Sequence, residues 1–333
     1  MSQKQAAHTS TGSSRVASSA SDDRVDVSIL VVSYNTREMT IECLRSVVRE
    51  TEDLAYEVLV MDNRSEDGSF EAIHGEFGDD PRFRCFESPT NLGFAGANNE
   101  LARSARGEYV LLLNPDTVVL DGAIQRLVDF ARQHDDHGIW GGRTLFADGS
   151  LNPTNCWRRY TIWSQFCRYF GLTWFAPGSG LFNPRAYAGW KRDSIREVDI
   201  VTGCFFLMRR SDWERLEGFD PEFFMYGEEV DLCLRARRLG LRAIVTPDAE
   251  IVHHGGASER VLEDKRVRLL TAEIQLQRRH WSPPKAWLGR MITRGGVLLR
   301  SVASTMARSL GRSDATSAWN RVWGRRGEWL RGG

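Results

Sequence analysis

VSILVVS, at residues 27–33, is the first of three apolar runs, followed by YEVLVM at 56–61 and YVLLL at 109–113. Runs this short and apolar are typical of strands that are buried on both faces of a parallel sheet. FRCF at 83–86 fits a further short strand, and helical spacing is expected over about residues 38–49, 95–105 and 122–134. Strands that alternate with helices predict an α/β fold with a mostly parallel sheet, whose ligands bind beyond the carboxyl ends of the strands.

The composition narrows the function classes. The chain of 333 residues has 44 basic and 44 acidic side chains, so its net charge is zero. This balance excludes a DNA-coating protein and an acidic disordered chain, and we expect no nucleic-acid partner. No apolar run is long enough for a membrane span, and residues 1–25 lack the apolar core of a secretory signal. We therefore expect a cytoplasmic protein whose six cysteines, none in a C-x-x-C pair, are reduced.

The chain divides into three segments. Residues 1–24 are rich in Ser, Ala and Thr and are predicted to be disordered, and residues 25–282 hold the alternating pattern. In residues 283–333, ten basic side chains face only two acidic ones, and the pattern predicts a helical extension. One expected face is apolar, with Leu288, Met291, Ile292, Leu298, Leu299, Val302, Met306 and Leu310. Arg290, Arg294, Arg300, Arg308 and Arg312 lie roughly opposite.

Two interpretations of this extension stay open. A basic amphipathic helix is suited to an anionic membrane surface. The alternative is a helix that packs on the main domain or on a partner subunit. The pair Gly295-Gly296 is expected to interrupt the helix in either case.

Polar residues follow two of the expected strands. Asp62 and Asn63 come after the second long run, and Asn114 and Asp116 after the third. A carboxylate at this edge accepts hydrogen bonds from a nucleobase or ribose, or coordinates a hard divalent cation. The alternative for either residue alone is a helix cap or a turn. Between them, Asn91 to Asn99 forms a loop whose glycines allow backbone to approach a ligand, although it matches neither a P-loop nor G-x-G-x-x-G.

The densest group of candidate residues lies near the third quarter of the chain. Helical spacing over residues 228–239 places Glu228, Glu229 and Asp231 in a first turn. The helix dipole favours carboxylates there, which is a sufficient structural reason for them. The functional interpretation is that one of them is a general base, kept ionised by the dipole. His253 precedes Gly255-Gly256 and is either a structural histidine or a contact to metal or phosphate.

The order of these motifs resembles that of family 2 glycosyltransferases, in particular the rhamnosyltransferase-like branch of bacterial polysaccharide assembly. The shared motifs run from Val-Ser-Tyr-Asn through Asp-Asn-x-Ser, Asn-x-Gly-Phe-Ala, Leu-Asn-Pro-Asp and Gly-Phe-Asp to His-x-Gly-Gly-x-Ser, over about residues 27–280. The resemblance implies a Rossmann-like GT-A fold and an inverting hexosyl transfer. The donor would be a dTDP- or UDP-sugar, with dTDP-rhamnose favoured, and the acceptor a hydroxyl of a saccharide or a lipid-linked saccharide.

The resemblance also assigns roles by position. It implies that Ser33, Tyr34 and Asn35 line the nucleotide pocket, that Asp62 binds the base beside Asn63, and that Asn91, Gly93 and Phe94 shape the donor site. Asn114 and Asp116 occupy the family's D-x-D metal motif, with Asn in its first position, and His253 is a contact to Mg²⁺ or Mn²⁺ or to the diphosphate. Glu229 takes the place of the Asp of the family's Glu-Asp pair as base, and Glu228 and Asp231 remain candidates.

Two other functions stay open. The Asn at 114 and the Glu at 229 are compatible with a non-catalytic protein that binds a sugar nucleotide or a glycan on the same fold. The basic extension is compatible with a membrane-associated scaffold at the inner face of the plasma membrane, where lipid-linked acceptors are made. The tryptophan-rich residues 150–195 fit an acceptor loop, because sugars stack on aromatic faces, but core aromatics have the same pattern.

Overall fold

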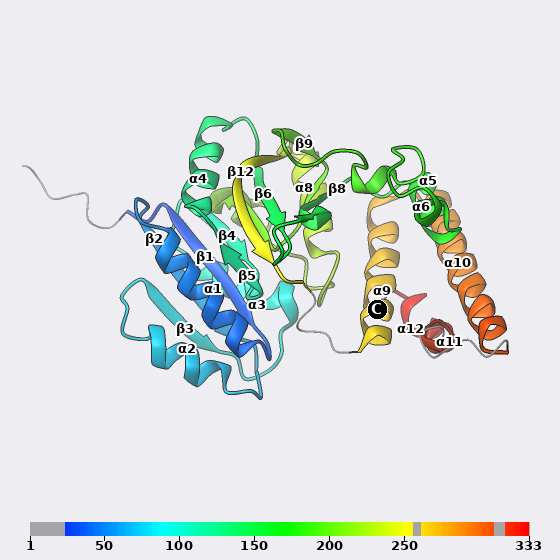
Figure 1. Ribbon diagram of the computed structural model, residues 1–333, viewed down its shortest axis with the longest axis horizontal. Coiled ribbons are helices and arrows are strands. Elements are labelled where there is room, and N and C mark those ends of the chain that lie inside the picture. The colour runs from blue at the N-terminus through cyan, green and yellow to red at the C-terminus, as the bar shows by residue number, and fades with distance from the viewer. Residues whose placement is uncertain (1–23, 256–260, 310–316, 333) are drawn as a thin grey trace, which may run out of the picture.

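The computed structural model describes residues 24–255, 261–309 and 317–332 (Figure 1). A sheet covered by helices is followed along the long axis of the molecule by a group of helices. The tail predicted to be disordered lies outside the described residues, except for residue 24. So do four residues that the sequence motifs include, Gly256, Ser258, Leu310 and Arg312.

The first half of the main sheet is parallel, as predicted. Its strands, in the order β3-β2-β1-β4, are β1 (Val27–Ser33), β2 (Tyr56–Asp62), β3 (Phe83–Glu87) and β4 (Tyr109–Leu113). The helices that connect them are α1 (Arg37–Glu50), α2 (Ser69–Phe77) and α3 (Gly93–Arg103). Because Ser33 pairs with Asp62 in register, the residues that follow β1, β2 and β4 emerge at one edge of the sheet.

The second half of the sheet is mixed. β11 (Phe205–Arg209) runs antiparallel to both β4 and β6 (Ile139–Leu145), and β12 (Ala243–His253) is parallel to β6. The smaller strands are β5 (Thr117–Val119), β7 (Leu151–Asn152), β9 (Arg196–Val198) and the separate pair β8 (Cys156–Trp157) and β10 (Ile200–Val201). The helices are α4 (Ala123–Gln133), α7 (Arg210–Arg215) and α8 (Glu228–Arg238). The α/β class is confirmed.

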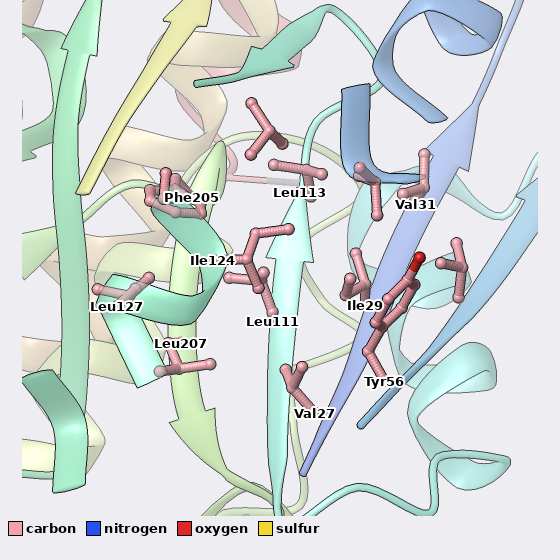
Figure 2. Close-up of a cluster of buried hydrophobic side chains, with 14 of the residues drawn as sticks. Val27, Ile29, Val31, Tyr56, Leu111, Leu113, Ile124, Leu127, Phe205 and Leu207 are labelled. Carbon is pink, nitrogen blue, oxygen red and sulfur yellow. The ribbon is translucent and has the colours of Figure 1, made fainter. Parts of the chain in front are cut away.

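The period of two along each strand divides the core into two layers. Val27, Ile29 and Val31 of β1 pack with residues of α1 and α4 such as Leu44 and Ile124, as Figure 2 shows for the strands and α4. The alternate residues of the same strands pack on the other face, against α3, α7 and α8. Both faces are therefore covered, and ligands can reach the sheet only at its edges.

The remaining helices form a group with its own small core. They are α5 (Ile162–Tyr169), α6 (Leu172–Phe175), α9 (Leu262–His280), α10 (Pro283–Ser309), α11 (Ser317–Gly324) and α12 (Arg326–Trp329), with two 3₁₀ turns at Pro153–Asn155 and Pro184–Ala186. Tyr169, Val267, Leu270, Val297, Val322 and Trp329 are buried among them. The extension expected from residue 283 is helical, and it packs on α9 and α5, which precede it in the chain.

The predicted break at Gly295-Gly296 is wrong, because α10 continues through both residues. A Cβ at Gly296 would lie 2.3 Å from the Cβ of Tyr169, so the glycine permits close contact between α10 and α5. The face that α10 buries is built of small residues: Ala286, Gly289, Thr293, Gly296 and Val297. Much of its apolar face stays exposed instead. None of the described helices is long and apolar enough to cross a membrane.

A buried carboxylate holds this helical group together. Glu273 of α9 is 2% exposed and accepts hydrogen bonds from Gln165 and Tyr169 of α5 and from Thr293 of α10, each at 3.0 Å. Arg168 donates a further hydrogen bond at 3.0 Å. Both oxygens of this carboxylate are therefore partnered, which is the condition for burying a charge without a large penalty.

Candidate functional site

A cavity of about 480 Å³ opens at the carboxyl edge of the parallel strands. Tyr34, Arg64, Glu66, Pro89, Thr90 and Asn91 line it. These residues follow β1, β2 and β3, so three loops form the walls. Ligands of open α/β sheets bind at this edge. Its ring, guanidinium and amide side chains are suited to a polar, planar ligand.

Asp62 and Asn63 directly precede Arg64, which lines this cavity. Asp62 is 3% exposed, and its Oδ2 accepts a hydrogen bond from the Ser65 backbone at 2.9 Å, whereas its Oδ1 is buried and has no partner. Asn63 accepts from the Leu92 backbone at 2.9 Å and donates to Asn91 at 3.1 Å. The unpartnered carboxylate oxygen of Asp62 is available to an N–H donor of a ligand, because a buried acceptor is costly to leave unpaired.

The loop at Asn91–Phe94 is fixed from the opposite side by Phe224. The Phe94 backbone N–H donates to the Phe224 carbonyl at 2.9 Å. A Cβ at Gly93, which has a φ of 71°, would lie 2.2 Å from that same carbonyl oxygen. Only glycine fits this position. The contact joins the loop of the cavity to the segment that leads into α8.

The first loop is positioned as predicted only in part. Tyr34 reaches the cavity, and Asn35 accepts a hydrogen bond from the Glu66 backbone at 2.8 Å, which ties the first loop to the second. Ser33 is fully buried, and its hydroxyl lies 3.0 Å from that of Thr40. The structure does not bring the Ser33 side chain to the cavity, because the last residue of β1 faces α1.

Asp116 and His253 meet at the same edge. β12 pairs with β5 so that His253 stands opposite Thr117, and the His253 Nε2 lies 3.4 Å from an Asp116 oxygen and 3.4 Å from the Asn114 amide. Burial opposes a charge on His253, but Cys204 and Asp116 raise its pKa to about 10. Although burial also opposes ionisation of Asp116, His253 holds the pKa of that carboxyl below its usual value. The Nδ1 of His253 is buried without a partner.

Glu228 and Glu229 begin α8, where Gly227, at a φ of 91°, makes the turn into the helix. Glu228 is 5% exposed and Glu229 is half-buried, and each keeps one buried carboxylate oxygen without a partner. Burial raises the pKa of both, and the charge of Glu229 adds to the effect on Glu228. The helix dipole was expected to keep the base ionised. Desolvation acts in the opposite direction here, and Arg185 partly offsets it at Glu229.

Asp231, the third predicted candidate, turns away from these two. It is fully buried, and its oxygens lie 2.6 Å from Arg235, 3.0 Å from Arg279 and 2.8 Å from His280. Although burial opposes its charge, hydrogen bonds from His280 and Arg235 hold the pKa of Asp231 below its usual value. Because α9 supplies two of these partners, Asp231 fastens α8 to α9.

The sequence analysis did not identify two arginines that lie near the candidate site. Arg64 lines the cavity and donates to the Pro89 carbonyl at 2.6 Å. Arg185 stacks over Tyr160 with its guanidinium carbon 3.9 Å from the ring centre. A basic residue directly after the strand-end Asp-Asn was a usable signal for Arg64. Nothing in the sequence pointed to Arg185, because it lies in the aperiodic residues 150–195 and approaches Glu229 only through the fold.

Comparisons with known proteins agree with this geometry. The model of the family described as Glycosyl transferase family 2 matches residues 28–216. The N-acetylglucosaminyl-diphospho-decaprenol L-rhamnosyltransferase of Mycobacterium tuberculosis is 30% identical over 279 residues, covering 76% of this chain and 85% of the relative. The O-antigen biosynthesis protein RfbC of Myxococcus xanthus is 28% identical over 242 residues, which are 70% of this chain and only 18% of that much longer protein.

Among solved structures, the mannosyltransferase of Pyrobaculum calidifontis in complex with GDP-Man and Mn²⁺ has a TM-score of 0.55 at 19% identity, with 93% of this chain and 86% of that chain covered. At this identity the likeness shows the fold alone. It confirms the GT-A fold that the sequence motifs predict.

Proposed function

Because this chain belongs to glycosyl transferase family 2, we propose that the site described above transfers a sugar from a nucleoside diphosphate to an acceptor hydroxyl with inversion. The observation that carries the proposal is the set of unpartnered buried groups at one edge of the sheet. Asp62, His253 and Glu229 each keep a buried polar atom without a partner. Such atoms are costly unless a ligand pairs with them, so they support a binding role.

The nucleotide would occupy the cavity lined by Tyr34 and Arg64. Asp62 would accept a hydrogen bond from the base through its free Oδ1. Asn35, Asn63, Asn91 and Gly93 would hold the loops around it, with Phe94 fixing the last loop against Phe224. Ser33 would support the first loop from inside the protein. The donor would be a dTDP- or UDP-sugar, and rhamnose is the sugar that the name of the M. tuberculosis relative favours.

Asp116 and His253 would hold a divalent cation, Mg²⁺ or Mn²⁺. Their facing atoms are 3.4 Å apart, a separation that two ligands of one ion can have, and Asn114 adds an amide beside them. No group of three or more His, Cys, Asp or Glu side chains suited to a metal occurs among the described residues. A site with few protein ligands is nevertheless usual for ions that also bind substrate phosphates. When bound, the ion would offset the negative charge that develops on the departing diphosphate.

Glu229 is our choice for the general base. Its carboxylate has a free oxygen, and burial raises its pKa toward the working range, which favours proton transfer. It would take the proton of the acceptor hydroxyl as that oxygen attacks the anomeric carbon from the face opposite the diphosphate. One displacement then inverts the configuration. Glu228 remains a candidate, whereas Arg235, Arg279 and His280 occupy both oxygens of Asp231, and we assign that carboxylate no role in proton transfer.

The acceptor would be a saccharide or a lipid-linked saccharide at the inner face of the plasma membrane. On the apolar face of α10, Leu298 is 41%, Leu299 51% and Met306 62% exposed, and the helix carries basic but no acidic side chains. Such a surface is suited to peripheral contact with anionic lipid. The family assignment does not favour a non-catalytic binding protein or a scaffold.

Thermal unfolding against a panel of sugar nucleotides tests the proposal. Each nucleotide sugar is added with Mg²⁺, with Mn²⁺ and with EDTA. A donor at about 100 times its Kd adds about 2.7 kcal/mol to the unfolding free energy, enough to measure. We expect one donor to stabilise the protein only with metal, and this shift to disappear in Asp116→Ala. A folded protein that no donor stabilises would contradict the site assignment.

A further inference from the structure

Residues 216–227, which the structure describes throughout, connect α7 with α8 without forming a helix or a strand. They lead directly into the first turn of α8, where Glu229 lies. Within residues 219–226 the buried side chains are those of Phe219 and Phe223. A segment with few buried side chains and no regular ladder of backbone hydrogen bonds opens locally at a low cost in free energy. The contacts that hold this segment therefore determine where the proposed base lies.

Asn99 of α3 holds the beginning of this segment. Its side-chain oxygen accepts a hydrogen bond from the Phe219 backbone N–H at 2.9 Å, and its side-chain nitrogen donates one to the Phe219 carbonyl at 2.8 Å. One amide side chain thus pairs with both backbone groups of a single residue, as a neighbouring strand does in a sheet. A Cβ at Gly218, which has a φ of 64°, would lie 2.5 Å from the Asn99 Oδ1. The glycine therefore allows the amide to come this close.

Phe94, also of α3, holds the end of the segment. Its backbone N–H donates to the Phe224 carbonyl at 2.9 Å, and its ring centre lies 6.0 Å from that of Phe219. Phe94 and Asn99 belong to one helix, so the spacing between these two contacts is fixed by helical geometry. α3 therefore restrains the segment both at Phe219 and at Phe224, shortly before the chain turns at Gly227 into α8.

The same helix begins at the cavity proposed for the nucleotide. Asn91 lines that cavity, and Asn63 donates to the Asn91 side chain at 3.1 Å and to the Gly93 carbonyl at 3.3 Å. A nucleotide in the cavity would restrain these residues at the start of α3. Because α3 also carries Asn99, filling the cavity and ordering the segment before α8 depend on one rigid element. Two sites that share such an element are energetically coupled when both bias its position.

The segment is also held by α9, which has no part in the cavity. Gln275 donates to the Glu222 carbonyl at 3.2 Å. Arg279 pairs with the carboxylates of Asp220 and Glu222. The residues that line the nucleotide cavity come instead from the loops after β1, β2 and β3. The contacts from α9 therefore stabilise the segment whether or not a donor is bound, and they provide a control for those from α3.

We propose that Asn99 is a positioning residue that links the donor cavity to the general base. A nucleotide sugar that restrains Asn91 and Gly93 also orders α3 and, through Asn99, residues 219–227. Glu229 is then held in place for the acceptor hydroxyl when the donor is bound. The inference rests on the proposed function and adds the residue through which placement of the base depends on the donor. Because coupling between binding sites is reciprocal, the ordered segment in turn favours donor binding.

Hydrogen–deuterium exchange of the full chain, with and without UDP or dTDP in the presence of Mn²⁺, tests this link. We expect one nucleotide to slow exchange both at residues 62–66 and at residues 219–227, by about fivefold or more, the lower end of usual coupling between sites. In Asn99→Ala, only residues 62–66 should remain protected. The matched control is Gln275→Leu, which removes a hydrogen bond from α9 to the same segment and should keep both protections. If Asn99→Ala unfolds early in a thermal melt, Asn99→Asp replaces it, because a carboxylate still accepts from the Phe219 N–H but cannot donate to the carbonyl.

Failure of the link and failure of the donor site give different exchange patterns. Wild-type protection at residues 62–66 without protection at residues 219–227 overturns the link and leaves the donor site in place. Protection of residues 219–227 that persists in Asn99→Ala, or that is lost equally in Gln275→Leu, overturns the role of Asn99. If neither nucleotide protects residues 62–66, the proposed donor site fails and the link fails with it.

Steady-state kinetics with the identified donor provide a second test. In Asn99→Ala, kcat should fall by up to about 10²-fold, the effect of a displacement of about 1 Å in a catalytic group, although the nucleotide still protects residues 62–66. In Gln275→Leu, kcat should stay unchanged. An unchanged kcat in Asn99→Ala would contradict a positioning role.

Discussion

The carboxylates buried at the edge of the sheet and those buried between the helices differ in their partners. Asp231 and Glu273 are each surrounded by side-chain donors, which leave no oxygen of either carboxylate unpaired. Glu228 and Glu229 each keep an oxygen that is buried and unpaired. Asp231 and Glu273 hold helices together. Glu228 and Glu229 each bury an unpaired oxygen, which costs free energy that a bound substrate can offset by pairing with it. Burial alone therefore does not distinguish a structural carboxylate from one that is available to a ligand, whereas a buried oxygen without a partner does.

The largest expected effect is on turnover and comes from the unpartnered pair. Glu229→Gln should lower kcat by about 10²–10⁴-fold, because it removes the general base and keeps the shape of the side chain. Donor-induced stabilisation in thermal unfolding should survive. Steady-state kinetics with the donor identified by the nucleotide panel checks this. Glu222→Gln, at an exposed glutamate just before α8, is the control.

A smaller loss in Glu228→Gln than in Glu229→Gln would agree with our assignment. The reverse order would move the role of base to Glu228.

The next effect is on stability and comes from the partnered carboxylates. Asp231→Asn should lower the unfolding free energy by about 3 kcal/mol, because Arg235, Arg279 and His280 lose their shared buried anion. Turnover per folded molecule should fall less than about tenfold. Urea unfolding at neutral pH gives the first quantity and active-site titration the second.

The pH dependence of unfolding tests whether the stability lost in Asp231→Asn is electrostatic. The pKa of Asp231 is lowered in the folded protein, so its contribution to stability is present above the pKa it has in the unfolded chain. That contribution is lost as the pH falls through the folded value. The difference between wild type and Asp231→Asn should therefore disappear in acid, and a difference that persists there would show that the loss is not electrostatic.

At Glu228 we expect the opposite dependence of stability on pH. Its pKa is raised by burial and by Glu229, so the folded state favours the protonated acid, and wild-type stability falls as the pH rises above the ordinary range of glutamate. Glu228→Gln removes this charge and should add about 1–3 kcal/mol to the unfolding free energy at pH 8. The gain should vanish at pH 4. Urea unfolding at both pH values measures it, and a loss of stability at pH 8 would mean that the carboxylate has a partner in solution.

The sequence predicted the regular parts of the fold well. β1, β2 and β4 are confirmed within one residue at each end, because strands buried on both faces have unbroken apolar runs. β3 is confirmed as closely, although it is an edge strand in which only Phe83 is buried. It did not predict the short strands β9, β10 and β11, or the existence of α9, whose pattern is dominated by charges. Those features depend on contacts with distant segments, which local periodicity does not contain.

The site was predicted from where strands end rather than from what surrounds each residue. Asp62 ends β2 and Asp116 follows β4, and the topology alone brings them to one edge. That Ser33 faces α1, that Asp231 faces α9 and that Arg185 approaches Glu229 are all consequences of packing. Spacing within one helix could not distinguish Asp231 from its neighbours, since all three carboxylates belong to the same first turn.

The smallest expected effect is on stability, and it compares two neighbouring glycines of α10. Gly295 and Gly296 are adjacent in α10, but a Cβ on Gly295 would meet only Phe170, at 4.0 Å, whereas one on Gly296 would collide with Tyr169. Gly295→Ala should therefore raise the unfolding free energy by about 0.4–1 kcal/mol, since alanine loses less entropy on becoming helical. Gly296→Ala should lower it, because α10 must move away from α5. Thermal unfolding compares the two. Because a Cβ on Gly295 would approach only Phe170, and none of the residues assigned to the donor, the metal or the base, kcat should be unchanged in Gly295→Ala. A fall in kcat in Gly295→Ala would show that the helical group and the edge of the sheet are coupled. The carboxylates that hold helices together would then also affect catalysis.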